Sequence, residues 1–304
     1  MSKFLIRFSL LLLLLSLGHL GLYYSDVPKP KWQTDEHKLN IINTGNSHGN
    51  SIVYNSTNLK GCNISRPANT IYYDLQNYQA IKHRLEPESI VLIPISYFSL
   101  GLDENRDDIG NDFMFYNYHY VPIKSIKNYS VLIHMELIIK QAKENLKGLF
   151  QKSTKVIGEF EVPVTQLLSG TEQEYYLIGH AEKRSLGHRR IGESGRTKSN
   201  LSYLTTLVKD CNASGFCPIL ITPPYHSSYN SQFTAEWLDN YFYTEIREFQ
   251  SKHQIAHLDY SKLAEISSKS ELFKNSDHLN DSGKKIFSST LLEKLKKEKI
   301  QFCR

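Results

Sequence analysis

The sequence predicts an α/β fold with three layers, in which helices cover both faces of a doubly wound, mostly parallel five-stranded sheet. Short, continuously apolar runs recur along the chain, as is typical of strands that are buried on both faces. Helical patterns alternate with these runs, which favours a parallel sheet. The 304 residues, 40% hydrophobic and 22% charged, are sufficient for one large domain with its own core.

The predicted elements alternate regularly along the chain. The strands are Leu39–Asn43, Cys62–Ser65, Ser89–Ile95, Pro218–Thr222 and Gln254–Leu258. The helices are Ser51–Asn58, Asn69–Arg84, Ser199–Asn212, Phe233–Lys252 and Ser282–Lys297. Ligands bind such sheets at the carboxyl ends of the strands, so functional side chains are expected in the segments that directly follow the strands.

The N-terminal segment has the pattern of a membrane anchor. The basic residues Lys3 and Arg7 precede the apolar run Phe8–Tyr24, and no clear cleavage site follows it. We predict a signal anchor or transmembrane segment at 1–24, with a cleaved signal peptide as the alternative. The positive-inside rule then predicts a single-pass protein of the inner (cytoplasmic) membrane whose main domain is extracytoplasmic, in the periplasm.

The rest of the chain divides into a linker at 25–37 and a domain at 38–304. A segment at about 100–196 interrupts the alternation of strands and helices and is predicted to be an insertion. It contains one long amphipathic helical pattern, Val131–Phe150. Such a segment forms either a lid or platform for substrate, or a structural excursion with no role in binding.

Charge, motifs and cysteines exclude several classes of protein. The net charge of +5 is scattered along the chain, so no nucleic-acid partner is predicted. The sequence has no phosphate-binding loop, dinucleotide fingerprint or zinc-protease motif, and its cysteines lack zinc-knuckle spacing, so no cofactor and no metal are predicted. Cys211 and Cys217 flank a short loop that a disulfide could close, one of the pairings that four cysteines allow.

A serine turn directly follows the first predicted strand. The sequence there reads Gly45-Asn46-Ser47-His48-Gly49. A serine in a tight, glycine-flanked turn between a strand and a helix exposes its hydroxyl, and its own N–H points outward where an oxyanion would be stabilised. Capping of the following helix is the alternative role for such a serine.

A histidine segment precedes the last predicted helix. It reads Asn275-Ser-Asp277-His278-Leu-Asn. A lone histidine in such a loop is more often structural or solvated than catalytic. Combined with the serine turn in this order, however, a histidine borne by a loop can reach back over the edge of the sheet and act as the base for Ser47.

The Gly-x-Ser47 turn and the Asn275-x-x-His278-Leu-Asn segment resemble the SGNH or GDSL hydrolase superfamily, over 39–99 and 199–295. The resemblance implies a flavodoxin-like fold, no cofactor and an ester substrate. It implies that Ser47 attacks the carbonyl carbon, while His278 takes the serine proton and returns it to the leaving alcohol. The chain is similar to membrane-anchored, extracytoplasmic members that modify envelope polysaccharides.

The supporting residues depart from the family pattern. The usual Gly-Asp-Ser has Asn46 as its middle residue, and the acid three residues before the histidine is Asn275. Asparagine can orient an imidazole, but it cannot stabilise the positive charge as a carboxylate does. Asp277 is adjacent to His278 in sequence, which does not establish that its side chain faces the ring. The sequence therefore allows a Ser–His dyad, a triad with a weak third member, or a decayed site.

Further residues are candidates for oxyanion or substrate binding. The backbone near Ser65 and Arg66 follows the second strand, where the family has a glycine donor. Ser96 or Tyr97 follows the third strand, in the place of the family's Gly-x-Asn-Asp block. His226 follows the fourth strand and is predicted to line the pocket, unless it lies on the surface of a rigid loop.

Three basic residues with helical spacing lie in the predicted insertion. His180, Arg184 and His188 fall on one face of a helix. A solvated face is the default interpretation of such a pattern. A cationic contact to substrate is the first alternative, and metal ligation is the second.

The sequence therefore predicts a serine esterase or O-acyltransferase that acts on acyl esters, above all acetyl esters, of a cell-envelope polysaccharide. The alternative is a catalytically impaired protein that binds glycan or a membrane acyltransferase partner. A third interpretation is a hydrolase of exported lipids or peptides. The first interpretation predicts an acylated glycan or a small ester as substrate, and the third would use the same Ser47–His278 pair.

Overall fold

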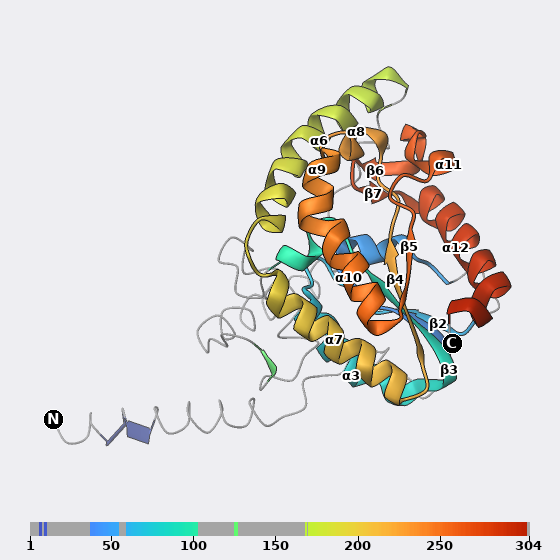
Figure 1. Ribbon diagram of the computed structural model, residues 1–304. Coiled ribbons are helices and arrows are strands. Elements are labelled where there is room, and N and C mark those ends of the chain that lie inside the picture. Colours follow the sequence, from blue (N-terminus) through green and yellow to red (C-terminus); the bar gives the residue numbers. More distant parts are fainter. Residues whose placement is uncertain are drawn as a thin grey trace, which may run out of the picture. The chain divides into compact units, whose positions relative to one another are not determined.

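The computed structural model describes residues 37–54, 59–102 and 170–302, together with a few isolated positions. The chain divides into two compact units. One unit combines Glu36–Glu104 with Gly158–Arg304 and carries both of the sheets that the structure describes (Figure 1).

The other unit combines Met1–Asp35 with Asn105–Ile157. Apart from isolated positions it lies outside the described residues, as do the predicted anchor at 1–24, nearly all of the linker at 25–37, and the helix predicted at Val131–Phe150. In the parts of the chain that the structure does describe, we find no helix that combines the length and the apolar character needed to span a membrane.

The central sheet is wholly parallel and has the strand order β2-β1-β3-β4-β5. Its strands are β1 (Leu39–Asn43), β2 (Gly61–Asn63), β3 (Leu85–Pro94), β4 (Cys217–Thr222) and β5 (Ala256–Asp259). This five-stranded parallel sheet confirms the fold class predicted from the apolar runs. The chain changes direction across the sheet between β1 and β3, so the carboxyl ends of these two strands flank the position where such folds bind ligands.

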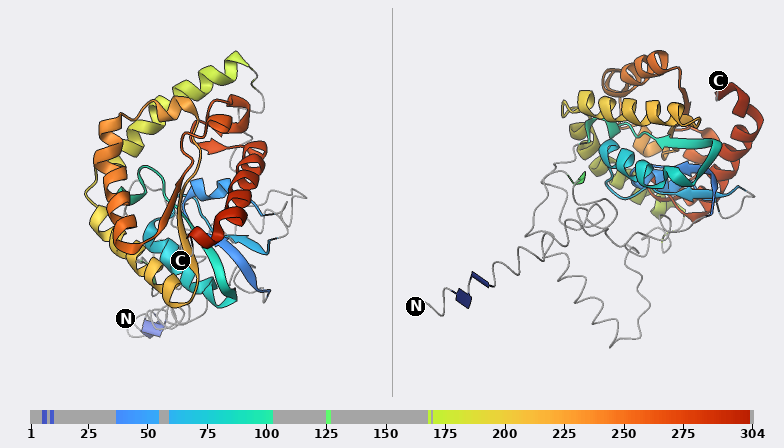
Figure 2. Two further views of the ribbon diagram at one scale, coloured as in Figure 1. Left: turned by 45° about the vertical axis from the view of Figure 1, so that its right-hand side comes forward. Right: turned by 90° about the horizontal axis from the view of Figure 1, so that it is seen from below.

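Helices cover both faces of the sheet, as the views in Figures 1 and 2 show. On one face, α12 (Asp281–Phe302) packs against alternate strand residues such as Ile41 and Leu92. The opposite face carries α3 (Ile71–Ile81), α7 (Thr197–Ala213) and α10 (Thr244–His253). Because both faces are buried, the strands read as continuous apolar runs rather than alternating ones.

The helix predicted at Ser51–Asn58 is wrong wherever the structure describes it. The chain instead forms the short 3-10 helix η1 (Ser47–Ser51), and 52–54 are not helical, while 55–58 lie outside the described residues. A Cβ on Gly49 would lie 2.6 Å from the carbonyl oxygen of Thr44, so this turn is packed directly against the end of β1. Close packing, rather than helical periodicity, therefore determines the conformation after β1.

The remaining elements lie mainly around the carboxyl end of the sheet. The helix predicted at Phe233–Lys252 is present as three joined parts, α9 (Ala235–Leu238), the π-helical turn η6 (Asp239–Tyr243) and α10. The smaller elements are η2 (Lys82–Arg84), η3 (Ser99–Gly101), α8 (Ser227–Asn230), α11 (Ala264–Ser267) and η7 (Ser270–Leu272). A two-stranded antiparallel hairpin, β6 (Phe273–Asn275) with β7 (His278–Leu279), completes this end of the unit.

One long helix falls within the predicted insertion at about 100–196. This helix, α6 (Thr171–Gly192), packs against α8 and η3 and makes further contacts with β6. It therefore belongs to the same compact unit as the sheet and lies over the carboxyl ends of the strands (Figure 1). Its position makes its inward face available to the site.

The predicted disulfide between Cys211 and Cys217 is wrong. Cys211 is a free, buried thiol in α7, whereas Cys217, the first residue of β4, is in a disulfide whose other half lies outside the described residues. The turn between α7 and β4 instead closes through backbone hydrogen bonds, including one of 2.9 Å from the Phe216 N–H to the Cys211 carbonyl.

Candidate active site

Ser47 lies at the carboxyl end of β1, where the chain turns into η1. Asn46 caps this turn, because its Oδ1 accepts a hydrogen bond of 3.0 Å from the His48 N–H. The Ser47 side chain is half-buried, and no acceptor for its own N–H lies among the described residues. Both the hydroxyl and the N–H are therefore available at the strand-order reversal between β1 and β3.

The turn before Ser47 is fixed by a buried carboxyl group. Gly45 has a φ of +110°, which L side chains rarely adopt, and a Cβ there would lie 3.0 Å from Pro94. Its N–H donates a 2.8 Å hydrogen bond to Asp74 Oδ1 on α3. Burial raises the pKa of the Asp74 carboxyl to about 7, although hydrogen bonds from Gly45 and Asn69 act in the opposite direction.

The raised pKa of Asp74 couples the stability of this turn to pH. The folded protein keeps the Asp74 proton up to about pH 7, whereas an unfolded chain releases it near 3.8, so protonation favours the folded state. This stabilisation is complete below about pH 4 and is lost as the pH rises to about 7. We expect Asp74→Asn to reduce the fall in free energy of unfolding between about pH 4 and pH 8 by on the order of a few kcal/mol.

Urea denaturation at several pH values measures the free energy of unfolding of the Asp74→Asn variant. Asp239→Asn, which removes an exposed ion pair, is the control. If the pH dependence of Asp74→Asn were the same as that of the wild type, the coupling would be contradicted.

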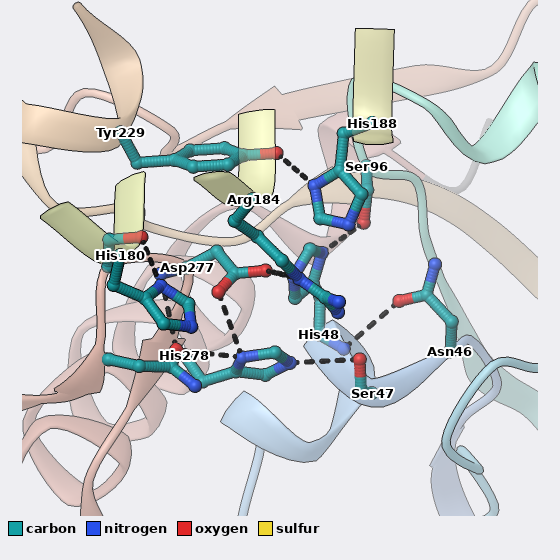
Figure 3. A network of polar contacts seen from close by, with 12 residues as sticks. Asn46, Ser47, His48, Ser96, His180, Arg184, His188, Tyr229, Asp277 and His278 are labelled. Carbon is teal, nitrogen blue, oxygen red and sulfur yellow. Dashed lines mark hydrogen bonds and ion pairs between the residues drawn. The ribbon is translucent and has the colours of Figure 1, made fainter. Parts of the chain in front are cut away.

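His278 is brought to Ser47 by the β6–β7 hairpin. The hairpin pairs Asn275 with His278, and Asn275 Oδ1 lies 2.9 Å from His278 Nδ1. The same oxygen accepts from the Asp277 N–H at 3.3 Å, so it is the acceptor and His278 Nδ1 carries the proton. His278 Nε2 is then free to accept the hydroxyl hydrogen of Ser47, at 2.9 Å (Figure 3).

Asp277 is fully buried and faces three cationic or imidazole groups. Its Oδ2 accepts from His48 Nε2 at 3.1 Å and from Arg184 Nε at 3.2 Å. Its Oδ1 lies 3.2 Å from His278 Nδ1, close enough for charge attraction but without hydrogen-bond geometry in the described residues. Burial by itself would raise the pKa of the Asp277 carboxyl, but His278, His48 and Arg184 outweigh it and hold that pKa well below its usual range.

His48 is a site residue that the sequence analysis did not identify. Burial lowers its pKa to about 4, so the ring is neutral near pH 7. Since a carboxylate can only accept, Nε2 carries the proton toward Asp277, and Nδ1 accepts from the Ser96 hydroxyl at 2.5 Å. His48 therefore holds Asp277 in place. Its position directly after the nucleophile was the one available signal.

The predicted oxyanion donors at Ser65 and Arg66 are already committed elsewhere. The Ser65 N–H donates to Asn63 Oδ1 at 2.9 Å, and its hydroxyl contacts the side-chain oxygens of Asn50 and Asn63, where its single hydrogen is used. The Arg66 N–H donates to the Gly45 carbonyl at 2.9 Å. The structure thus uses these groups to tie β2 to the serine turn, and they are not free to bind an oxyanion.

Ser96, Tyr97 and His226 also have structural rather than substrate-facing positions. Ser96 is buried behind His48, and its N–H donates to Ser99 Oγ at 2.8 Å. Tyr97 is fully buried and donates to Asn230 Oδ1 at 2.9 Å. His226 is buried as well; its ring contacts Ser228 and Ser270, while its N–H holds the Ser276 carbonyl. The polar atoms of these three side chains are satisfied within the fold, so a contact between them and the substrate stays a prediction.

The basic face of α6 contacts the site, although the Arg184 side chain on it stays partly exposed. His180 Nδ1 contacts Ser276 Oγ at 2.8 Å. Ser276 stands between Asn275 and Asp277 in the hairpin segment. His188 is buried, contacts the Tyr229 hydroxyl at 2.6 Å and stacks on Phe98. Arg184 lies between them and reaches Asp277. The structure thus places all three residues around the site. Their residue types and spacing alone did not indicate which role they have.

His48, Asp277 and His278 are residue types that bind metals, and one donor atom of each lies within 4.8 Å of the others. Their observed contacts fit a hydrogen-bonded catalytic group better. Asp277 Oδ2 is already shared by His48 and by the cationic Arg184, and His278 Nε2 faces the Ser47 hydroxyl. The absence of a metal remains a prediction.

No protein-family model matches the sequence, and no curated protein matches it significantly. Several solved structures are similar to the chain, and two of them are described as acylhydrolases. One is a putative acylhydrolase from Bacteroides fragilis, with 10% identity, a TM-score of 0.36, and coverage of 90% of this chain and 91% of that one. The other is a lipase/acylhydrolase from Enterococcus faecalis, with 12% identity, a TM-score of 0.36, and coverage of 85% and 95%. Both likenesses are distant, so the chemistry of this site follows from its own side chains.

Proposed function

We propose that this protein is a serine esterase or O-acyltransferase in which Ser47 is the nucleophile and His278 is the general base. One observation carries the proposal: Ser47 Oγ lies 2.9 Å from His278 Nε2, while His278 Nδ1 lies 2.9 Å from Asn275 Oδ1. A hydroxyl, an imidazole and an acceptor in this order form the arrangement that activates serine for acyl transfer.

The reaction would proceed through an acyl-serine. Ser47 Oγ bonds to the carbonyl carbon of the ester, its proton passes to His278 Nε2, and one electron pair of the C=O bond moves to the oxygen. When that pair returns, the ester C–O bond breaks and the leaving alcohol takes the proton from His278. Water, or a sugar hydroxyl in a transferase, then attacks the acyl group with His278 again as base, and Ser47 regains its proton.

Two residues share the role that one acid has in the family pattern. Asn275 accepts from His278 Nδ1 and so fixes the ring and its tautomer. Asp277 supplies the negative charge: its Oδ1 lies 3.2 Å from the same nitrogen and would face the positive charge of the imidazolium that forms during the reaction. This division answers the concern raised by Asn275, and it favours catalysis over the alternative of an impaired protein that only binds glycan or a partner.

The substrate class and the location are part of the proposal. We propose acyl esters, above all acetyl esters, of an envelope polysaccharide, processed outside the inner membrane by a domain tethered through the segment at 1–24. The disulfide at Cys217 supports an extracytoplasmic location, since disulfides persist in oxidising compartments. A membrane acyltransferase that supplies or receives the acyl group is the partner that this role would need.

A fluorophosphonate probe tests the proposed nucleophile directly. Ser47 Oγ would displace fluoride and form a stable covalent bond with phosphorus, so we expect the folded protein to be labelled at Ser47. Labelling should disappear in Ser47→Ala and in heat-unfolded protein, and it should fall strongly in His278→Ala, because the base no longer activates the hydroxyl. Mass spectrometry locates the label. A folded protein that stays unlabelled would favour the impaired alternative.

A further inference from the structure

Attack on an ester at Ser47 creates a negative charge for which the surrounding backbone offers few donors. The N–H groups of Ser65, Arg66 and Ser96 donate to Asn63, Gly45 and Ser99, respectively. Next to the nucleophile, the N–H groups of Asn46 and Ser47 have no acceptor in the described parts of the chain. Both are neutral donors, so a cationic side chain beside them would add to the stabilisation of the oxyanion.

Arg184 lies in a suitable position for this role. Its Nε donates to Asp277 Oδ2 at 3.2 Å, and its side chain is 45% exposed. Figure 3 shows the side chain running down from α6 past Asp277, with its terminal nitrogen atoms directed to the side where Ser47 lies. No described residue accepts a hydrogen bond from these two terminal NH2 groups. The guanidinium is thus held along one edge while its other donors are open.

We propose that the terminal NH2 groups of Arg184 donate hydrogen bonds to the oxyanion that forms when Ser47 attacks the ester. The proposal deepens the esterase function proposed above and rests on it. As the Ser47 proton passes to His278 and the C=O electron pair moves to oxygen, the new negative charge would form beside the guanidinium group. The remaining donor of the pair would be the Ser47 N–H.

The contact with Asp277 explains how an arginine can serve here without binding anions indiscriminately. Before the reaction, the guanidinium is paired with a buried carboxylate, so the site carries little net charge. Because that carboxylate also lies 3.2 Å from His278 Nδ1, one residue places its negative charge beside both the base and the oxyanion donor. A donor that is fixed in advance stabilises a developing charge without having to reorganise when the charge forms.

The test compares Arg184→Met, Arg184→Lys and the control Arg190→Met on the same helix, in the full-length protein. With the uncharged substrate p-nitrophenyl acetate, we expect Arg184→Met to lower kcat about 100-fold with KM changed less than about threefold, as is typical when an oxyanion donor is lost. Arg184→Lys should lose about tenfold, because one ammonium cannot bind both Asp277 and the oxyanion. Arg190→Met should retain the wild-type kcat, since Arg190 has no contact with the site among the described residues.

Three results would overturn the inference while leaving the esterase function intact. The kcat of Arg184→Met could stay within about threefold of wild type. The loss could be confined to KM for esters that carry a carboxylate, which would make Arg184 a substrate-binding residue. It could also vanish at high pH, which would mean that Arg184 acts only on the proton affinity of His278. A wild-type protein with no hydrolysis and no probe labelling would instead contradict the esterase function itself.

Discussion

Replacing Ser47 with alanine is expected to lower kcat for ester hydrolysis by about 10⁴- to 10⁶-fold. The variant keeps the binding surface and the neighbouring donors but has no atom that can form the acyl intermediate. Ser47 is half-buried and its side chain has one hydrogen bond, to His278, so folding stability should change by less than about 1 kcal/mol. Initial rates with p-nitrophenyl acetate measure the first effect, and thermal unfolding measures the second.

The matched control for Ser47→Ala is the variant that also removes the base. Nucleophile and base act as one unit, so Ser47→Ala/His278→Ala should be no slower than the worse single variant. If Ser47→Ala kept more than about 1% of the wild-type kcat, a different nucleophile would have to be sought. If the loss of kcat in the double variant equalled the product of the two single losses, the two residues would act independently, which the 2.9 Å contact contradicts.

Replacing Asp277 with asparagine is expected to lower kcat by about 10³-fold, although the two side chains have nearly the same shape. Oδ2 of Asp277 accepts from both His48 and Arg184, so the amide oxygen must occupy that position. The amide NH2 then takes the place of Oδ1, 3.2 Å from the His278 Nδ1 that already carries a proton. The imidazolium would lose its negative partner and face another donor. Steady-state kinetics across pH measure the loss.

Asn275→Asp provides the rescue for Asp277→Asn. It places a carboxylate where Asn275 now accepts from His278 Nδ1 at 2.9 Å. The double variant Asn275→Asp/Asp277→Asn should therefore recover at least about tenfold of the lost kcat, because the charge returns by the route that the family pattern uses. If Asp277→Asn stayed within about threefold of wild type, Asn275 would be sufficient as the third member and the shared role would be wrong.

The sheet could be predicted because its strands are buried on both faces. Ile41 and Leu92 face α12, while Ile42 and Val91 face the opposite helices, so no polar alternation breaks the apolar runs. The pattern of apolar runs gives no information on η1, because the conformation of this turn depends on the packing of Gly49 against the end of β1. It also gave none on the β6–β7 hairpin, which is too short to show a period of its own.

The two central site residues could be predicted because local motifs mark them, whereas their supporting residues could not. Ser47 and His278 each stand in a recognisable segment. Asp277, by contrast, is defined by what reaches it: His48 from η1 and Arg184 from α6. These contacts join parts of the chain that are far apart, so no spacing in the sequence records them. For the same reason the sequence places Tyr97 among the candidate hydrogen-bond donors and His226 in the pocket, although both side chains are buried in the fold.

The contact between Ser47 and His278 joins positions 231 residues apart, and α12, which follows His278, is tied back to the serine turn by a hydrogen bond from the Val53 N–H to Ser288 Oγ. A ribosome would therefore release the nucleophile early and its base nearly last. During synthesis the serine would be an ordinary alcohol, and the nascent chain would be unable to cleave any ester it met. Enzymatic activity would begin only when the last part of the unit docks. The appearance of activity would therefore show that folding is complete.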